Sequence, residues 1–279
     1  MIGQPHRPML RAGCEANLGS CVESVANMIR LRSVNPGQLA IYWLCQAGFV
    51  FKNSSGVVVY IDPYFSDVVE RVVGFKRMMT CPLPVEDADA DLIVFTHEHL
   101  DHMDTDALPI LAKNPRTQFA GPVECMKEFQ KLSIPPGRCH LLEEGSRLTV
   151  KGVEVAAVYA DHGELAPDAL GIVLGFDGIK VYHTGDTAYR PDQFRSAIEM
   201  RPDILIPCIN GRFGNMDAHE AAMLTQLVEP AVVIPSHFWM FVEQNGEPAP
   251  FLEECEIRVP STRRVLTKPG EEFLFEKAQ

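Results

Sequence analysis

A short run of histidines with one aspartate, directly after an apolar segment, constrains this chain most. Residues 91–95 read Asp-Leu-Ile-Val-Phe and predict a buried strand, and residues 97–102 continue as His-Glu-His-Leu-Asp-His. Side chains two apart at a strand end point the same way, because a strand alternates its faces. Convergence of these groups predicts a site for one or two divalent metals rather than a solvated histidine-rich loop. The candidate ligands are His97, His99, Asp101 and His102.

The charge balance argues against partners that need a basic surface. The 279 residues include 37 acidic and 25 basic ones, which gives a formal net charge of −12. Nucleic acids and anionic membranes are bound through Lys and Arg, so we expect neither as a partner. We expect a small-molecule substrate, phosphorylated or otherwise anionic, held in a local basic pocket. Assembly into a homo-oligomer is compatible with the sequence.

Apolar runs and cysteines indicate the compartment. No apolar run is long enough to span a membrane, and no apolar signal region follows the basic residues of positions 1–11. The eight cysteines are scattered, without a Cys-x-x-Cys pair. Such spacing favours reduced thiols over a disulfide framework or a zinc ribbon. We therefore expect a cytoplasmic enzyme.

Strand and helix patterns predict one domain, residues 39–279, after a leader, residues 1–38. The leader lacks strand alternation, and residues 21–32 predict a short helix packed on the outside. The predicted strands are 40–45, 48–52, 57–62, 91–95, 147–150, 153–159, 171–176, 180–183, 204–207 and 231–235, and the predicted helices are 104–113, 123–132, 191–200 and 218–227. A group of strands rich in hairpins is followed by helices, and this order occurs twice along the chain. It predicts an α/β fold with two sheets packed face to face and helices outside, a four-layer αββα sandwich.

Three more candidate ligands each follow a predicted strand: His162, Asp186 and His237. This is the same relative place as that of His97, and sites on open sheets collect at strand ends. Taken singly, a hydrogen-bonded surface or core residue explains each histidine as well. Taken together with residues 97–102, they predict one metal centre built from distant parts of the chain.

In this order the candidate ligands resemble those of the metallo-β-lactamase superfamily, and the resemblance extends from about residue 40 onward. It implies the αββα fold and two metal ions. The implied ligands are His97, His99 and His162 for the first ion and Asp101, His102 and His237 for the second, with Asp186 bridging both. No cysteine stands at a ligand position, which is similar to the hydrolases of the superfamily. A ligand set of only nitrogen and oxygen is compatible with Mn²⁺, Zn²⁺ or Fe.

A narrower resemblance concerns three short segments. Residues 42–49, Tyr-Trp-Leu-Cys-Gln-Ala-Gly-Phe, resemble the opening of the L-ascorbate-6-phosphate lactonase group, as do residues 61–64 and 209–211. Cys45 stands where that group usually has Gly, and the chain is shorter than its typical members. The resemblance implies a hydrolase that opens the lactone of a phosphorylated sugar acid.

The implied chemistry assigns roles to three carboxylates. A divalent ion lowers the pKa of bound water, and the resulting metal-bound hydroxide can attack a carbonyl or phosphoryl centre. Asp101 and Asp186 are the predicted catalytic residues: Asp101 would position the water, and Asp186 would hold the ions together. Asp62 follows a predicted central strand and is a candidate to orient a ligand imidazole. A strand-end turn before Pro63 explains Asp62 equally well.

Candidate substrate-binding residues follow the strand at 204–207. Asn210 and Arg212 lie at the strand edge that should face the metals, and the guanidinium of Arg212 suits a phosphate or carboxylate. His219 opens a predicted helix and is a further candidate donor. A solvated surface position is the alternative for Arg212 and His219. Four residues form either an apolar pocket wall or plain core: Met216, Trp239, Met240 and Phe241.

Several functions compete with a lactonase. The first alternative is a phosphodiesterase or another small-molecule ester hydrolase of the same fold. An RNA nuclease is disfavoured by the acidic composition and by the lack of a long insertion between Asp186 and His237. A di-iron redox protein usually carries a flavin domain, for which 279 residues leave no room. A non-catalytic binding protein predicts missing ligands, whereas all seven positions are filled.

Overall fold

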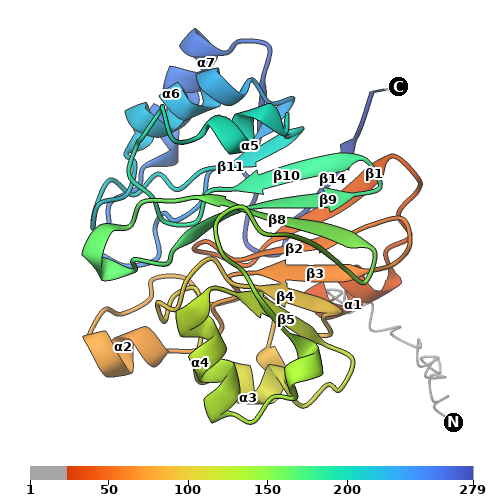
Figure 1. Cartoon of the computed structure of the whole chain (residues 1–279). Coiled ribbons are helices and arrows are strands. Elements are labelled where there is room, and N and C mark those ends of the chain that lie inside the picture. Colours follow the sequence, from red (N-terminus) through yellow and green to blue (C-terminus); the bar gives the residue numbers. More distant parts are fainter. Residues whose placement is uncertain (1–23, 279) are drawn as a thin grey trace, which may run out of the picture.

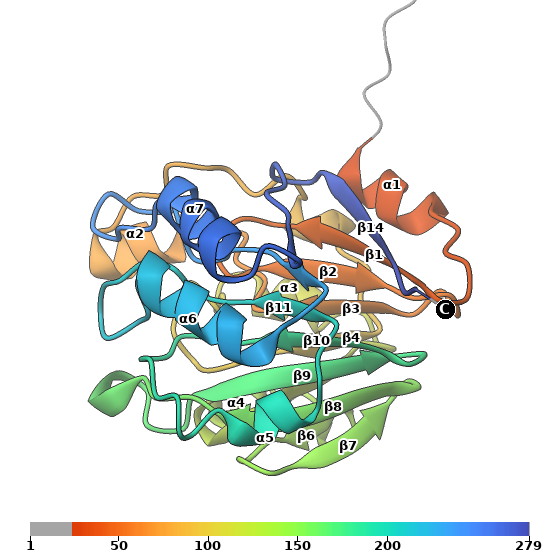
Figure 2. The same ribbon diagram turned by 90° about the horizontal axis from the view of Figure 1, so that it is seen from above.

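Two β-sheets face each other in the computed structural model, which describes residues 24–278 (Figure 1). The first sheet has the strand order β14-β1-β2-β3-β4-β5-β6 and the second has the order β13-β12-β11-β10-β9-β8-β7. Helices α1, α3 and α4 cover the outer face of the first sheet, and α5, α6 and α7 cover that of the second, as Figures 1 and 2 show. The predicted αββα sandwich is confirmed.

The strands and helices have the following bounds. The first sheet consists of β1 (Gln38–Trp43), β2 (Phe49–Lys52), β3 (Val58–Ile61), β4 (Leu92–Val94), β5 (Gln118–Gly121), β6 (Cys139–Leu141) and β14 (Glu272–Glu276). The second consists of β7 (Arg147–Val150), β8 (Val153–Tyr159), β9 (Leu170–Phe176), β10 (Ile179–His183), β11 (Ile204–Ile206), β12 (Val232–Val233) and β13 (Arg263–Arg264). The helices are α1 (Val25–Leu31), α2 (Val68–Val73), α3 (Leu108–Leu111), α4 (Val123–Lys131), α5 (Arg195–Glu199), α6 (Ala218–Val228) and α7 (Pro248–Arg258), with 3₁₀ turns η1 (Val85–Asp87), η2 (Pro136–Arg138) and η3 (Gly163–Leu165).

Strands buried on both faces hold the layers together. In β1, Leu39 and Ile41 point into the core between the sheets, whereas Ala40 and Tyr42 pack under the outer helices. Such strands read as continuous apolar runs, since each face is covered. The central core therefore fixes the two sheets relative to each other. The strand ends from which the site loops begin are held in place in the same way.

Strand direction brings the candidate ligands to one edge. Strands β3 to β6 are parallel, as are β10 to β13, and β8 runs in the direction of β10 because each is antiparallel to β9. The candidate ligands follow β4, β8, β10 and β12. Loops after parallel strands converge at the carboxyl edge of a sheet, where ligand sites of α/β folds collect.

Some predicted elements differ from those observed. The strand predicted to reach residue 45 ends at Trp43, because Cys45 and Gln46 take positive φ angles of 78° and 49°. The helix predicted over 104–113 is only α3, since the carboxylate of Asp104 accepts the backbone N–H groups of Asp106 and Ala107 in a turn. The helix predicted over 191–200 is only α5. Elements β5, β6, β13, β14, α2 and α7 were not predicted.

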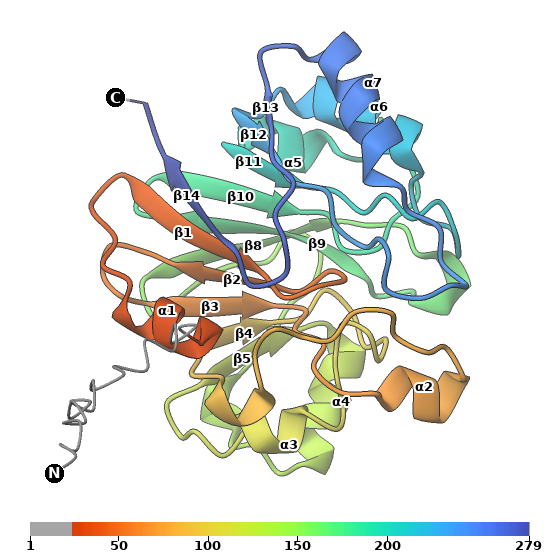
Figure 3. The ribbon, with the colours of Figure 1, turned by 180° about the vertical axis from the view of Figure 1, so that it is seen from behind.

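The ends of the described chain lie against the first sheet. Helix α1 falls within the helix predicted over 21–32, and Lys52 Nζ donates to the carbonyl oxygens of Ile29 and Arg30. Strand β14 pairs with β1, so the two lie side by side in Figure 3. The leader's first 23 residues lie outside the described part. Within residues 24–278, no helix has both the length and the apolar character needed to cross a membrane.

Candidate metal centre

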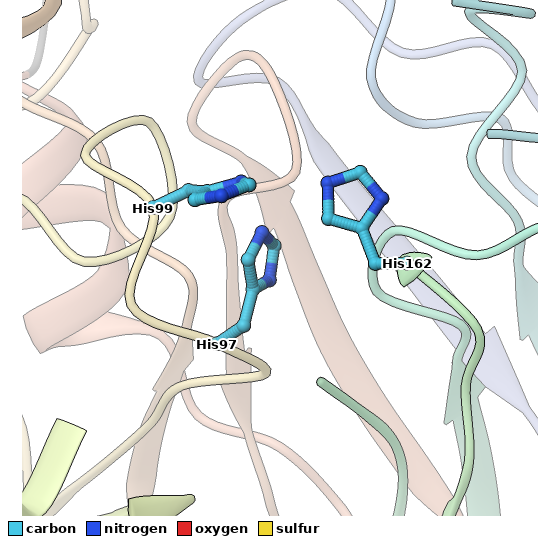
Figure 4. A group of neighbouring side chains, drawn as sticks. All are labelled: His97, His99 and His162. Atoms are coloured by element: carbon cyan, nitrogen blue, oxygen red, sulfur yellow. The ribbon is translucent and has the colours of Figure 1, made fainter. Parts of the chain in front are cut away.

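Three imidazoles point toward one another at the carboxyl edge of the sheets. His97 and His99 come from the loop after β4, and His162 from the turn after β8, as Figure 4 shows. One ring nitrogen of each lies within 4.8 Å of those of the other two. This is the group that the sequence resemblance assigned to the first ion.

A second group lies next to the first. Asp101, His102 and His237 each offer one ligand atom, and these atoms also lie within 4.8 Å of one another. Asp186 stands between the groups: its Oδ1 lies 3.3 Å from His102 Nε2, and its Oδ2 lies 3.2 Å from His237 Nε2 and 3.8 Å from His162 Nε2. A carboxylate in that place is suited to bridge two ions.

Several buried polar atoms of the cluster have no hydrogen-bond partner. His97 Nε2, His102 Nε2 and Asp186 Oδ1 are buried and accept or donate no hydrogen bond. Each unpaired buried polar atom costs about 1–3 kcal/mol, so such a cluster needs an explanation. A divalent cation would satisfy the imidazole lone pairs and the carboxylate oxygen together. The residues therefore fit a metal centre.

The groups of the cluster set each other's charge. Burial and the neighbouring His102 lower the pKa of His97 well below its usual value, which keeps His97 neutral as a ligand must be. Burial opposes ionisation of Asp186, but His237 and His102 outweigh burial and hold the pKa of its carboxyl well below the usual range. Burial likewise opposes the charge of Asp101, and the ring of His102 reverses that effect and lowers its pKa.

Hydrogen bonds behind the cluster fix which ring nitrogen faces it. Asp62 is fully buried at the end of β3, and its Oδ2 lies 2.8 Å from His102 Nδ1, which leaves Nε2 toward the cluster. Its Oδ1 accepts the backbone N–H of Thr96 at 2.8 Å. This is the place that an orienting carboxylate requires. Similarly, His99 Nε2 donates to the carbonyl of Leu165 at 3.0 Å and leaves Nδ1 free.

Two residues at the cluster were not predicted as site residues. Gln46, in the loop between β1 and β2, is wholly buried, and its Nε2 donates to Asp101 Oδ2 at 2.7 Å and to Gln244 Oε1 at 3.0 Å. Asn215 Nδ2 donates to Asp186 Oδ2 at 2.7 Å. A polar side chain within the apolar run 42–49 was a usable signal for Gln46. No local pattern marked Asn215.

A pocket of about 400 Å³ opens beside the cluster. Its floor includes four candidate ligands, His99, Asp101, His162 and Asp186. The remaining lining residues are Val69, Val73, Phe75, Glu98, Leu100, Leu165, Phe213, Phe241 and Gln244. Metabolite pockets typically have volumes of about 300–1,000 Å³, so this pocket is large enough to bring a small molecule onto the ligand cluster.

The predicted substrate residues lie away from this pocket. Asn210 is buried, donates to the Arg212 carbonyl at 3.3 Å and lines a neighbouring pocket of about 620 Å³. Arg212 is exposed, and the chain bends at Gly211, which has a φ of 59°. His219 faces α7, where its Nδ1 lies 3.4 Å from a carboxylate oxygen of Glu254. Their contact with substrate stays a prediction.

Four apolar residues have mixed positions. Phe241 is buried and lines the metal pocket, as a wall residue would. Met216 and Met240 are wholly buried core residues. Trp239 is 44% exposed and lines the neighbouring pocket instead. Only Phe241 of the four thus contributes to the wall over the candidate ligands.

Comparisons with known proteins bear on the family and the fold of the chain. A family model described as "Beta-lactamase superfamily domain" matches residues 40–237. A "UPF0173 metal-dependent hydrolase" of Aeropyrum pernix is 30% identical over 241 residues, which cover 81% of this chain and 94% of that protein. A protein of the same description from Archaeoglobus fulgidus is 28% identical over 250 residues, which cover 86% of this chain and 100% of that protein. The solved structure of Igni18, a metallo hydrolase of Ignicoccus hospitalis, shares the fold, with a TM-score of 0.69 and 23% identity over 86% of this chain and 100% of that chain.

Proposed function

The chain belongs to the metallo-β-lactamase superfamily, among its UPF0173 metal-dependent hydrolases, and we propose that it hydrolyses a small-molecule lactone or ester at the candidate metal centre. The observation that carries the proposal is the convergence of the ligand cluster on the floor of an open pocket. A substrate bound in that pocket would lie against four of the candidate metal ligands. The apolar wall would exclude water around it.

The seven candidate ligands would hold two ions. His97, His99 and His162 would hold one, Asp101, His102 and His237 the other, and Asp186 would contact both. Bound divalent ions polarise a substrate carbonyl and lower the pKa of water toward neutrality. We propose Mn²⁺ or Zn²⁺, with Fe as the alternative, because nitrogen and oxygen ligands suit all three.

Asp101 is suited to orient the attacking water. Its side chain is 15% exposed and lines the pocket, whereas those of Asp186, His102 and His237 are 6% exposed or less. Its lowered pKa keeps the carboxylate ionised, so Asp101 can accept a hydrogen bond from water across the ordinary pH range. Gln46 holds Oδ2 of this carboxylate in place. Asp186, buried between the two groups, would disperse the charge of the ions.

The lactone of a phosphorylated sugar acid is the specific substrate that the resemblance of residues 42–49 suggests. That run forms the end of β1 and the loop that carries Gln46 to the ligand cluster. Hydrolysis of a phosphodiester by the same groups is the alternative. We also propose that the protein works in a reducing compartment such as the cytoplasm, since Cys45, Cys81, Cys125, Cys139, Cys208 and Cys255 are free thiols.

The test is turnover by metal-free protein reloaded with Mn²⁺ or Zn²⁺. L-ascorbate 6-phosphate, followed by loss of its enediol-lactone absorbance, tests the sugar lactone, and hydrolysis of a lactone or ester that depends on the added ion is the expected result. p-Nitrophenyl butyrate and bis(p-nitrophenyl) phosphate serve as ester and phosphodiester comparisons. Hydrolysis of the ester without that of the lactone would reject the sugar lactone and keep the hydrolase. Undiminished turnover in protein shown to be metal-free would reject the metal-dependent reaction.

A further inference from the structure

We propose that the pocket beside the metal centre takes an uncharged substrate and binds it through an apolar group. The inference rests on the proposed hydrolase function, because it places the bond to be cleaved over the candidate ligands. It keeps the hydrolysis of a lactone or ester and replaces the anionic substrate expected from the sequence, the phosphorylated sugar lactone included, with an uncharged one. Its basis is the chemistry of the side chains that surround the pocket.

Apolar side chains form most of the wall above the ligands. They come from α2, from the loops after α2 and after β4, and from three later loops, and they are Val69, Val73, Phe75, Leu100, Leu165, Phe213 and Phe241. No Lys or Arg occurs among the lining residues, all of which belong to the described part of the chain. Phosphate and carboxylate groups are normally held by such cations. The wall therefore offers an anionic group no partner.

The polar lining residues also disfavour an anion. Glu98 and Gln244 are the polar lining residues outside the ligand cluster, and neither side chain carries a positive charge. Asp101 and Asp186 add two carboxylates on the floor. With the two proposed ions bound, these carboxylates would be occupied as ligands, and the ions would attract the oxygen of the bond to be cleaved at the floor. Away from the floor, a charged substrate tail would lose its hydration against the apolar wall without meeting a cation, whereas a neutral acyl or aryl group has no such cost.

Three aromatic rings from separate segments pack together in the wall. Phe75 lies 6.1 Å from Phe213 and 6.2 Å from Phe241, measured between ring centroids. Phe213 is 45% exposed and Leu165 is 54% exposed, although both line the pocket. Exposed apolar side chains gathered in a concave site mark a ligand-binding surface, because burial by a ligand stabilises them. An apolar group of the substrate would provide that burial.

Two probes that differ in one charge test the inference by binding alone. N-butyryl-p-nitroanilide is neutral, and N-succinyl-p-nitroanilide carries a carboxylate on an acyl chain of the same length. Titration calorimetry with the zinc-loaded protein should show at least about tenfold tighter binding of the butyryl probe, with a negative heat-capacity change. Equal or tighter binding of the succinyl probe, or binding of neither, would overturn the inference.

Matched variants test whether the preference for the butyryl probe over the succinyl probe arises at the pocket wall. Phe213→Ser and Leu165→Ser replace exposed residues, so both proteins should fold, and each should reduce the preference for the butyryl probe about tenfold. Ile257→Ser is the control, because Ile257 is 79% exposed on α7 and lines no part of this pocket. An equal loss in Ile257→Ser would assign the preference to the general surface and overturn the inference.

Activity separates this inference from the proposed function. The p-nitrophenyl esters of butyric and succinic acid report hydrolysis with the same pair of acyl groups. A preference in binding without hydrolysis of either ester would reject the proposed function and keep the apolar pocket. Hydrolysis of both esters at equal efficiency, with equal binding, would keep the function and reject the apolar pocket.

Discussion

Oδ2 of Asp62 lies 2.8 Å from Nδ1 of His102, although the two residues are 40 positions apart in the chain. Both side chains are fully buried, and the parallel pairing of β3 with β4 brings them together. The contact fixes the ring of His102 with Nε2 toward Asp186. One hydrogen bond thus links the central sheet to the candidate metal centre.

Replacement of this carboxylate should weaken metal binding. We expect Asp62→Asn to lower affinity for Zn²⁺ about 10–100-fold, because the amide orients the ring less firmly and makes it less basic. Competition with a chromogenic chelator measures the change. Asp104→Asn is the control: Asp104 is also buried, but it accepts hydrogen bonds from Phe65, Ser66 and Ala107 and contacts no candidate ligand. Equal weakening in Asp104→Asn would contradict an orienting role.

Removal of one imidazole should abolish hydrolysis and leave the fold intact. His99 is only partly buried in the loop after β4, so His99→Ala should leave the circular dichroism spectrum unchanged. Metal content, measured by mass spectrometry, should fall, and Asp101→Ala should likewise lose activity. The control His140→Ala removes a histidine that contacts Gln118 and no candidate ligand. Full turnover by metal-free His99→Ala would argue against the proposed centre.

The stability of ion-free protein should fall at alkaline pH. Burial disfavours the charge on His237, but Asp186 and Asp101 outweigh burial and raise its pKa from 6.5 to about 9. Because the folded protein holds this proton more tightly than the unfolded chain, the stabilisation is complete below pH 6.5 and is lost as the pH rises through about 9. Urea unfolding with a chelator, between about pH 6 and pH 10, measures it. A flat profile across that range would contradict the assignment.

Metal binding should show the opposite dependence on pH. Ligand imidazoles must be neutral, so an ion displaces the protons of His237 and of His102, whose pKa is also raised, against burial, by Asp186 and Asp62. Zn²⁺ affinity should therefore increase between about pH 6 and pH 9, with proton release. Calorimetry in buffers of different ionisation enthalpy counts the protons. Uptake of protons on binding would be incompatible with these ligands.

The amide of Gln46 should matter for turnover more than for metal content. Gln46→Ala removes the donor to Asp101, and a hydrogen bond to a charged group contributes about 1.5–3 kcal/mol. We expect kcat to fall roughly 10–100-fold, with KM and bound metal changed much less. Gln118→Ala, at β5 away from the cluster, is the control. Loss of metal in parallel with kcat would show that Gln46 supports the ligands rather than the reaction.

Arg212→Ala tests the predicted anion contact. Arg212 is exposed next to the pocket residue Phe213, so it is placed to meet a substrate tail only outside the apolar wall. We expect the variant to leave KM unchanged for both p-nitrophenyl succinate and p-nitrophenyl butyrate, because no Arg occurs among the residues that line the pocket. A higher KM for the succinate ester alone would show that Arg212 makes an ionic contact with the substrate.

Local sequence patterns predicted the fold class. They also predicted that most residues of the ligand cluster follow strands. Strands buried on both faces left continuous apolar runs, and the ligand residues follow such runs at β4, β8, β10 and β12. Short elements escaped prediction: β13 has two residues, and α2 has six. Strand β14 was missed because its pairing with β1, from the other end of the chain, is not visible in local sequence.

By itself, the sequence determined the residue types that can bind metal and their positions at strand ends, since covalent order and the period of a strand fix both. Only the tertiary structure decided which groups meet. It placed Gln46 and Asn215 against the ligand carboxylates, and it turned His219 toward α7. It also surrounded the pocket with Phe75, Phe213 and other apolar residues instead of cations. These outcomes depend on loops from distant strands that pack together, and such packing leaves no periodic trace in the chain.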